Sequence, residues 1–501
     1  MAHHPVDTVV GIDEEKPSAT SHIDDASAPN AYHDLYIDPV EEQRLRRKLD
    51  LYILPVFTVG YLLMFLDRSN IGNARAAGLV GDLRLHQYDF NAGTSLYYIT
   101  YLACDIFSGL LVKRFGFILV PISVVLFGLV TLVQAWMTNR TGFYLARVAL
   151  GMSESFLMPG ISYLLTRYYR RGELTVRFGF FMVVAAGLAG AFGGLLAAGL
   201  LAVGKIGSLQ GWRNIFLVEG IITMGIGIIL LFIFPDDPER TKYLNERERE
   251  LAIKRIYVDQ PQIRETKEEI DRDLIRRGLL NINTVGAIWL YCCTNVTVQG
   301  LGVFLPSVLR VNYPGASNVR IQILTVPVYI VAMVVTLIIT YLCVRLRTHW
   351  YFAALGGALA ITGYGIWVGT GPDDAQLRYA ACFLNMSSGF ILGPVALGWA
   401  AANASPDTIR AMVGAVVTGF AGFGAVGGLW AYPANTAASG YRPGNIFNVS
   451  MGVSCILCST GLMLYQRREN KRRDEGLRDY RLKKGGIEKL GNLHPSYRYI
   501  H

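Results

Sequence analysis

The sequence predicts an all-α membrane protein whose twelve transmembrane helices form two pseudo-symmetric bundles of six. Apolar residues make up 52% of the 501-residue chain and charged residues only 17%, which favours lipid over water as the main solvent. Twelve apolar runs are each long enough for a helix to cross about 30 Å of hydrocarbon. A hydrophilic segment rich in Arg, Lys and Glu follows the sixth run and divides the chain six plus six.

The twelve runs are bounded by charged or turn-forming residues. In chain order they cover residues 51–73, 91–112, 117–137, 142–166, 178–203, 215–234, 285–306, 322–344, 351–370, 379–402, 412–432 and 446–465. They define a disordered N-terminal tail at 1–45, a first bundle at 46–235, a connector at 236–283, a second bundle at 284–467 and a C-terminal tail at 468–501. The N-terminal tail is polar and has no apolar stretch of the kind that marks a cleavable signal peptide.

Clusters of positive charge predict which side of the membrane the tails occupy. An even number of spans places both tails and the connector on one side, and all three carry Lys and Arg clusters, at 44–48, 247–255 and 467–473. Because cytoplasmic segments are enriched in Lys and Arg, we expect this side to be cytosolic, with the chain in the plasma membrane. The net charge of +9 is concentrated in these segments, which favours a lipid bilayer over nucleic acid as the partner.

The two halves of the chain resemble each other, as expected of a duplicated membrane fold. Met152-Ser153 in the fourth run matches Met386-Ser387 in the tenth, and Arg177 then corresponds to Arg410. The similarity predicts that the two bundles are related by pseudo-symmetry.

Charged side chains inside apolar runs are costly in lipid and are therefore the first candidates for a functional site. The purely apolar part of the first run, residues 51–66, is too short for a span, so its helix should continue through Asp67 and Arg68. At depth, Asp67 is expected to take a proton and Arg68 to bind an anion. The alternative is an interfacial ion pair at the end of the helix.

In the fourth run, Arg147 and Glu154 are seven residues apart, which places both on one face of a helix. We expect Glu154 to bind and release a proton while Arg147 holds its charge or that of a substrate. The alternative is a static structural ion pair.

Asp105 in the second run shares a stripe with Tyr98 and Tyr101, a polar and aromatic face suited to a cavity. Its alternative place is near the cytosolic end of the helix, beside Lys113 and Arg114. The second half of the chain has fewer charges in its runs. It offers amides that can bind a substrate or join helices, namely Asn295, Gln299 and Asn385.

These motifs resemble the fungal allantoate permease-like branch of the anion:cation symporters, in the major facilitator superfamily. The resemblance covers most of residues 45–470 and includes YLLMFLDRSNIGNAR, ARVALGMSESFLMPGISYLLTRYYRRGELTVR, GWRNIFLVEG, FPDDPER and WAAANASPDTIRA. It implies the major facilitator fold and proton-coupled movement of small organic anions, such as carboxylate vitamins, ureides or small peptides. It also implies coupling and substrate roles for Asp67, Arg68, Arg147 and Glu154, and a substrate contact for Tyr101.

The chain departs from the family pattern in two helices that border the expected cavity. The second helix has Asp105, Phe107, Ser108 and Gly109 where Glu-x-Pro-Ser-Asn is usual, and the eleventh has Ala425 where an Asn is common. Loss of that polar Asn changes the cavity, so the substrate can differ from those of better-known permeases.

The leading hypothesis is a monomeric, non-enzymatic symporter of a small organic anion and protons, with no cofactor and no metal. Export of a secondary metabolite keeps the same fold and is the main alternative. A non-transporting nutrient receptor is a third reading, although such receptors usually have longer signalling tails than the 34 residues from 468 to 501.

Overall fold

The computed structural model describes residues 37–86, 88–259, 276, 280–346, 348–371, 374–405, 407–420, 422–484 and 491–501. In this part of the chain the elements are α1 (Pro39–Ala76), α2 (Leu79–Asp82), α3 (Asp89–Phe115), α4 (Leu119–Gln134), α5 (Arg140–Glu154), α6 (Leu157–Tyr168), α7 (Arg171–Ala202), β1 (Lys205–Ile206), β2 (Leu209–Gln210), α8 (Trp212–Ile233), α9 (Glu246–Asp259), α11 (Ile282–Asn312), α12 (Asn318–Leu346), α13 (Trp350–Gly369), α14 (Ala375–Ala402), α15 (Asp407–Phe420), α16 (Gly422–Trp430), η2 (Ala434–Ser439), α17 (Arg442–Asp474), η3 (Asp479–Lys484) and η4 (Gly491–Leu493).

The elements confirm the predicted twelve-helix membrane fold. Nine helical segments in the described ranges are long and apolar enough to cross a membrane, with α5 and α6 together forming one of them. The bent helix α3 adds a tenth span, and the shorter apolar helices α4 and Val416–Trp430 complete the set. A short span is accommodated by local thinning of the bilayer or by snorkelling of the flanking residues.

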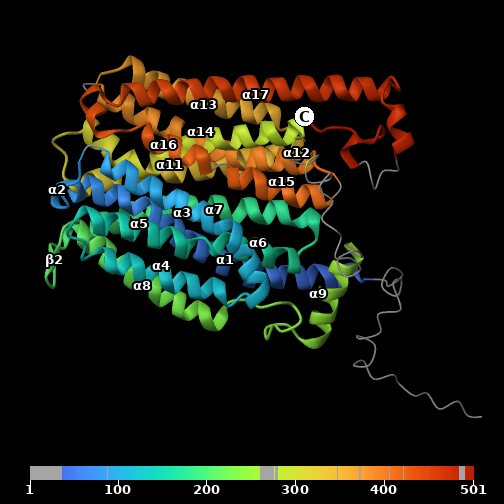
Figure 1. Ribbon diagram of the computed structural model, residues 1–501, viewed down its shortest axis with the longest axis horizontal. Helices are drawn as coiled ribbons and strands as arrows, with labels where there is room; N and C mark the ends of the chain where they lie inside the picture. The colour runs from blue at the N-terminus through green and yellow to red at the C-terminus, as the bar shows by residue number, and fades with distance from the viewer. Residues whose placement is uncertain are drawn as a thin grey trace, which may run out of the picture.

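The helices form two bundles that lie side by side (Figure 1). The first bundle contains α1 to α8, coloured blue to green, and the second contains α11 to α17, coloured yellow to red. Across the boundary, α7 packs on α12, α1 on α11, and α3 on α16. We name the two ends of the molecule by their elements: the α9 end, where both described termini lie, and the hairpin end, which carries β1 and β2.

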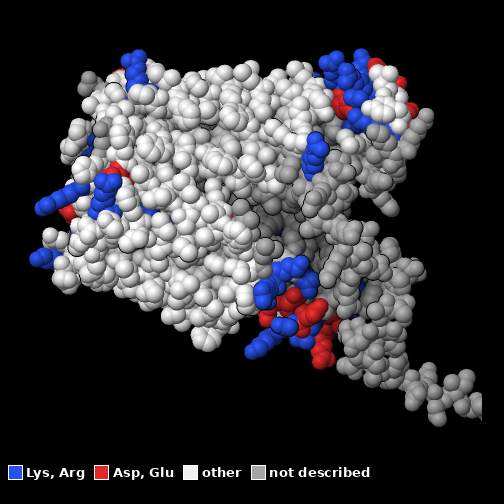
Figure 2. Space-filling model, in the orientation of Figure 1, with Lys and Arg blue, Asp and Glu red and all other residues white. Residues whose placement is uncertain are grey.

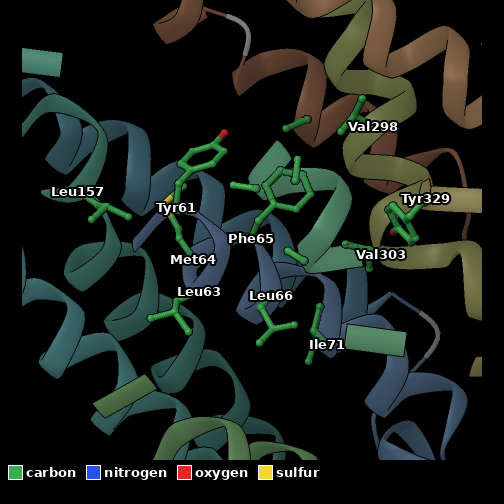
Figure 3. Packing of buried hydrophobic residues seen from close by; sticks show 14 of the residues in the cluster. Tyr61, Leu63, Met64, Phe65, Leu66, Ile71, Leu157, Val298, Val303 and Tyr329 are labelled. Atoms are coloured by element: carbon green, nitrogen blue, oxygen red, sulfur yellow. The ribbon is translucent and has the colours of Figure 1, made fainter. Parts of the chain in front are cut away.

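A continuous hydrophobic core crosses the boundary between the bundles. Phe65 and Ile71 of α1 belong to the same buried cluster as Val303 of α11 and Tyr329 of α12 (Figure 3). The packing is close because the helices present glycine where their backbones meet. A Cβ on Gly72 would overlap the carbonyl of Val303, and one on Gly194 would overlap Thr325.

The N-terminal helix begins earlier than the predicted boundary at residue 46, while residues 1–36 of the predicted tail lie outside the described residues. Asp38 caps the helix by accepting a hydrogen bond from the backbone N–H of Val40 at 2.9 Å. Leu45 and Leu49 are buried, so this first stretch of α1 is amphipathic and packs on the rest of the bundle.

The connector contains the helix α9, which is fixed to the first bundle by a buried guanidinium. The side chain of Arg255 is fully buried; its Nη2 lies 2.5 Å from Glu173 Oε2 on α7 and its Nε lies 3.3 Å from Glu42 Oε1 on α1. Two carboxylates around one buried arginine make this a strong, geometrically specific link. The described part of the connector is therefore attached to the first bundle.

The last residues of the chain fold back on the second bundle, although the sequence predicts only a polar tail there. The carbonyl of Ile500 accepts hydrogen bonds from Trp399 Nε1 at 2.9 Å and from Asn403 Nδ2 at 2.8 Å. The carbonyl of His501 accepts one from the backbone N–H of His349 at 2.7 Å. These bonds hold the end of the chain against the loops before α13 and after α14 at the α9 end.

Candidate functional site

An ion pair between α1 and α5 is the centre of the candidate site. Arg68 Nε lies 3.2 Å from Glu154 Oε2, and the Glu154 side chain is fully buried. The hydroxyl of Tyr97 on α3 donates a hydrogen bond of 2.5 Å to the same carboxylate oxygen. A carboxylate in a water-poor interior requires such partners, because the desolvation of an isolated charge is very costly.

Two tyrosine rings of α3 flank the Arg68 guanidinium. Its carbon lies 4.7 Å from the ring centre of Tyr101 and 5.4 Å from that of Tyr97. Cation–π contacts of this kind hold the planar group in place without using up its N–H donors. Arg68 is therefore oriented by aromatic faces while donors remain for a second anion.

Asp67 points away from its neighbour Arg68, so the ion pair between them, which was the alternative interpretation, does not form. Successive residues of an α-helix are turned by about 100° from each other, which sends the two side chains to different helices. The hydroxyl of Thr131 on α4 is 2.7 and 2.8 Å from the two Asp67 oxygens, and Asp67 is almost fully buried. Arg68 therefore lies at the cavity, whereas Asp67 lies in the interior of the first bundle.

Arg147 is buried on α5 and donates a hydrogen bond through Nη2 to Gln134 Oε1 of α4. It interacts electrostatically with Asp67 and Glu154, but the direct ion-pair partner of Glu154 is Arg68. Arg147 and Glu154 both point into the interior from α5, as their spacing predicts. The rotation of α1 about its own axis brings Arg68, and not Arg147, into contact with the Glu154 carboxylate.

The predicted residues of α3 and α11 meet across the bundle boundary. Tyr98 donates a hydrogen bond of 2.7 Å to Gln299 Oε1, and Gln299 Nε2 is 3.5 Å from Asn295 Oδ1. Asp105 is half-buried further along α3, where it interacts electrostatically with Arg68. These contacts place amides of the second bundle beside the aromatic face of the first.

Asn385 lies elsewhere. It is buried on α14 and its carboxamide oxygen occupies the space beside Gly363 of α13, where a Cβ would overlap it. The side chain therefore faces another helix of the second bundle, and neither its oxygen nor its nitrogen has a hydrogen-bond partner among the described residues.

A small cavity lies between the bundles beside the ion pair. Its lining residues are Arg68, Ile71, Thr94, Tyr97, Tyr98, Arg147, Leu150 and Val303. Toward the hairpin end the bundles touch, for example through Trp430 Nε1, which donates to Ser95 Oγ at 3.1 Å. Figure 2 shows the molecule hollowed between its two halves at the α9 end, beside the charged groups that gather there. Both arginines thus border a space that is closed at the hairpin end.

Sequence reasoning missed four polar residues of this region. They are Tyr97, Thr131, Gln134 and Glu219, the last of which is fully buried on α8. Glu219 carried a usable signal, because it is a lone acid in the sixth apolar run and the rule applied to Asp67 applies equally to it. Thr131 and Gln134 are uncharged, and nothing in a single sequence distinguishes them from ordinary helix-joining residues.

Two bundles around a buried ionic site define a membrane transporter that works between two faces of a bilayer. The family model of the Major Facilitator Superfamily matches residues 57–429, and the chain belongs to that family.

The relatives are transporters. An uncharacterised transporter of Schizosaccharomyces pombe is 30% identical over 474 residues, covering 94% of this chain and 96% of its own length. The high-affinity nicotinic acid transporter of Saccharomyces cerevisiae is 30% identical over 362 residues, covering 72% of this chain and 65% of its own.

Among solved structures, a bacterial homologue of the human lysosomal transporter Spinster, in an inward-facing and unoccupied conformation, has a TM-score of 0.64. It is 15% identical and covers 85% of this chain and 97% of that chain. At this identity the likeness confirms the fold.

Proposed function

We propose that the chain is a proton-coupled symporter that moves a small organic anion by alternating access. The observation that carries the proposal is the ion pair between Arg68 and Glu154 at the border of the central cavity. A substrate carboxylate and Glu154 would compete for the same guanidinium. A proton on Glu154 removes this competition, so proton and anion favour each other's binding.

The other charged and polar groups have supporting roles in this proposal. Arg147 borders the cavity and adds a second positive charge, while Asp67 takes a proton inside the first bundle. Asp105, between Arg68 and the α9 end, is a third acid on the proton route. Substrate contacts are assigned to Arg68, Arg147, Tyr98, Tyr101, Asn295 and Gln299. Asn385 faces α13 and does not belong to this set.

The substrate class is a small carboxylate such as a vitamin, a ureide or a small peptide. The flat guanidinium of Arg68, flanked by two tyrosine rings, suits a compact planar acid. A relative named as a nicotinic acid transporter supports this class, and so does the resemblance to the allantoate permease-like branch.

The conformation supports alternating access, because the bundles touch at the hairpin end while the molecule is hollowed at the α9 end. The Lys and Arg clusters at the α9 end favour a cytosolic location for both termini. We assign the chain to the plasma membrane as a monomer, with the hollow open to the cytosol.

A transport assay in proteoliposomes tests the proposal. Radiolabelled nicotinic acid and a panel of carboxylate vitamins, ureides and small peptides are offered at two external pH values. Glu154→Gln should lose accumulation driven by a proton gradient and retain counterflow exchange, because the neutral amide imitates a permanently protonated acid.

The matched control is Glu250→Gln, which changes an exposed acid on α9 and should behave as the unsubstituted protein. Full proton-driven accumulation by Glu154→Gln would contradict the proposal.

A further inference from the structure

Glu219 is a buried acid that the proposed mechanism leaves unused. It lies on α8 and is fully buried, and neither of its carboxylate oxygens has a hydrogen-bond partner among the described residues. The backbone of α8 lies directly against α4, since a Cβ on the next residue, Gly220, would overlap Leu132. Glu219 is thus held in a packed interior where an unbalanced charge is very costly.

The groups around Glu219 come from three helices. It interacts electrostatically with Arg147 and Glu154 of α5, and Asp67 and Asn70 of α1 are its neighbours on the other side. On α4 the groups bonded to these neighbours are uncharged, namely Thr131, which is bonded to Asp67, and Gln134, which is bonded to Arg147. The amide nitrogen of Asn70 is buried without a partner, so it is a donor available to the Glu219 carboxyl.

The charges of this interior do not balance. The connected acids are Asp67, Glu154 and Glu219, and the connected bases are Arg68 and Arg147. Arg68 is committed to Glu154, so Arg147 remains as the only base of this group beside the two other acids. Two carboxylates beside one guanidinium, away from water, reach neutrality when they hold one proton between them.

We infer that Asp67 and Glu219 share a proton and form a second proton-binding site inside the first bundle, distinct from Glu154. The inference rests on the proposed symport for its role, because Arg147 joins this pair to the cavity. An anion bound to Arg147 neutralises part of the positive charge that Arg147 presents to Asp67 and Glu219. The pair then holds its proton more firmly, so anion and proton binding reinforce each other by the same free energy.

Infrared spectroscopy of the purified protein in lipid nanodiscs tests this site without any substrate. The unsubstituted protein should show the carbonyl stretch of a protonated, buried carboxyl at neutral pH. Glu219→Gln should lose that band, because Asp67 is then balanced by Arg147 alone. Asp67→Asn should lose it as well, since Glu219 gains the same guanidinium.

The matched control is Thr223→Val, which changes a buried hydroxyl one turn further along α8 and should leave the band unchanged. Glu219→Asp is the second variant: it keeps an acid, so the band should shift instead of disappearing, and this outcome separates a titrating group from a packing defect. Retention of the unshifted band in folded Glu219→Gln and Asp67→Asn, with folding verified by thermal unfolding, would overturn the inference.

A transport measurement separates this inference from the proposed function. If the unsubstituted protein shows no dependence on a proton gradient, the symport proposal fails, while loss of the band in Glu219→Gln still establishes the buried site. If symport is present, Glu219→Gln should lower proton-driven accumulation of nicotinic acid at least tenfold and leave counterflow exchange intact. Unaltered accumulation would show that the shared proton is not a transported one.

Discussion

The side-chain amide of Asn91 donates a hydrogen bond of 2.6 Å to the backbone carbonyl of Leu429, and this bond joins α3 to α16 across the two bundles. Asn91 is fully buried there. A buried bond to a backbone carbonyl exists only while the hairpin end is closed, since separation of the bundles would expose both groups. In the proposed alternating access, the bond therefore stabilises the conformation in which the hairpin end is closed.

Asn91→Ala should shift this balance away from the closed hairpin end. Loss of one buried hydrogen bond costs about 1 kcal/mol, which corresponds to a change of about fivefold in the ratio of two conformations. The measurement is the labelling rate of a cysteine introduced in place of Ser95, reached from the hairpin side. Thr100→Val is the control, because its hydroxyl bonds to Leu96 of the same helix. An equal labelling rate in both variants would contradict the assigned role of Asn91.

Arg68→Lys should raise the KM for the anion at least tenfold while the protein still folds. Lysine keeps the charge, but it lacks the flat group that lies between the rings of Tyr97 and Tyr101 and that presents several donors at once. Uptake kinetics in proteoliposomes measure the change. Arg114→Lys, at an exposed position near the end of α3, should have no effect. An unchanged KM in Arg68→Lys would remove Arg68 from the substrate site.

Gly194→Ala and Gly199→Ala should have opposite effects on stability, although both change a glycine of α7. A Cβ at Gly194 would overlap Thr325 of α12 and the carbonyl of Gln322, whereas nothing lies within 4 Å of one at Gly199. We expect Gly194→Ala to cost about 1–3 kcal/mol through overpacking. Gly199→Ala should gain up to about 1 kcal/mol from helix propensity. Thermal unfolding in detergent compares the two, and equal midpoints would contradict the close approach of α7 and α12.

Docking of the chain end should weaken as the pH falls. Burial lowers the pKa of His349 to about 4, and hydrogen bonding of its side chain to the backbone of His501 opposes the shift. When the end is released, the pKa returns to about 6.5. The docked state therefore keeps its full stability above pH 6.5 and loses it progressively as the pH falls toward 4. Burial also lowers the pKa of His501, so it acts with the same sign.

Hydrogen exchange of residues 491–501 between pH 7 and pH 4.5 measures this release, after correction for the intrinsic effect of pH on exchange. His349→Phe combined with His501→Gln is the control: the phenylalanine ring can still stack on Trp399, as the His349 ring does, and neither residue titrates. In this variant the corrected protection should be independent of pH. The same pH dependence in the variant and the unsubstituted protein would exclude the two histidines as its cause.

Most of the fold could be predicted from the sequence, because hydrophobic runs and charged connectors report directly on the bilayer. The cost of charge in lipid identified Asp67, Arg68, Arg147 and Glu154 as candidate site residues. Their pairing could not be predicted, since it depends on the rotation of α1 against α4 and α5, which tertiary packing determines. Glu219 was missed although the same rule applied to it.

The ends of the chain show a different limit of sequence reasoning. The stretch of α1 before residue 46 is charged on one side and apolar on the other, and only the burial of Leu45 and Leu49 shows what it packs against. The bonds of Ile500 and His501 use backbone carbonyls, which are the same in every residue type. No pattern of side chains can indicate such contacts in advance.

Because Arg255 binds Glu42 and Glu173, α9 should move together with the first bundle during the proposed alternating access. The distance between a spin label on α9 and another on α13 would therefore report the relative position of the two bundles. This distance should differ between the inward-facing and outward-facing conformations. It can be measured without changing any residue of the proposed substrate site.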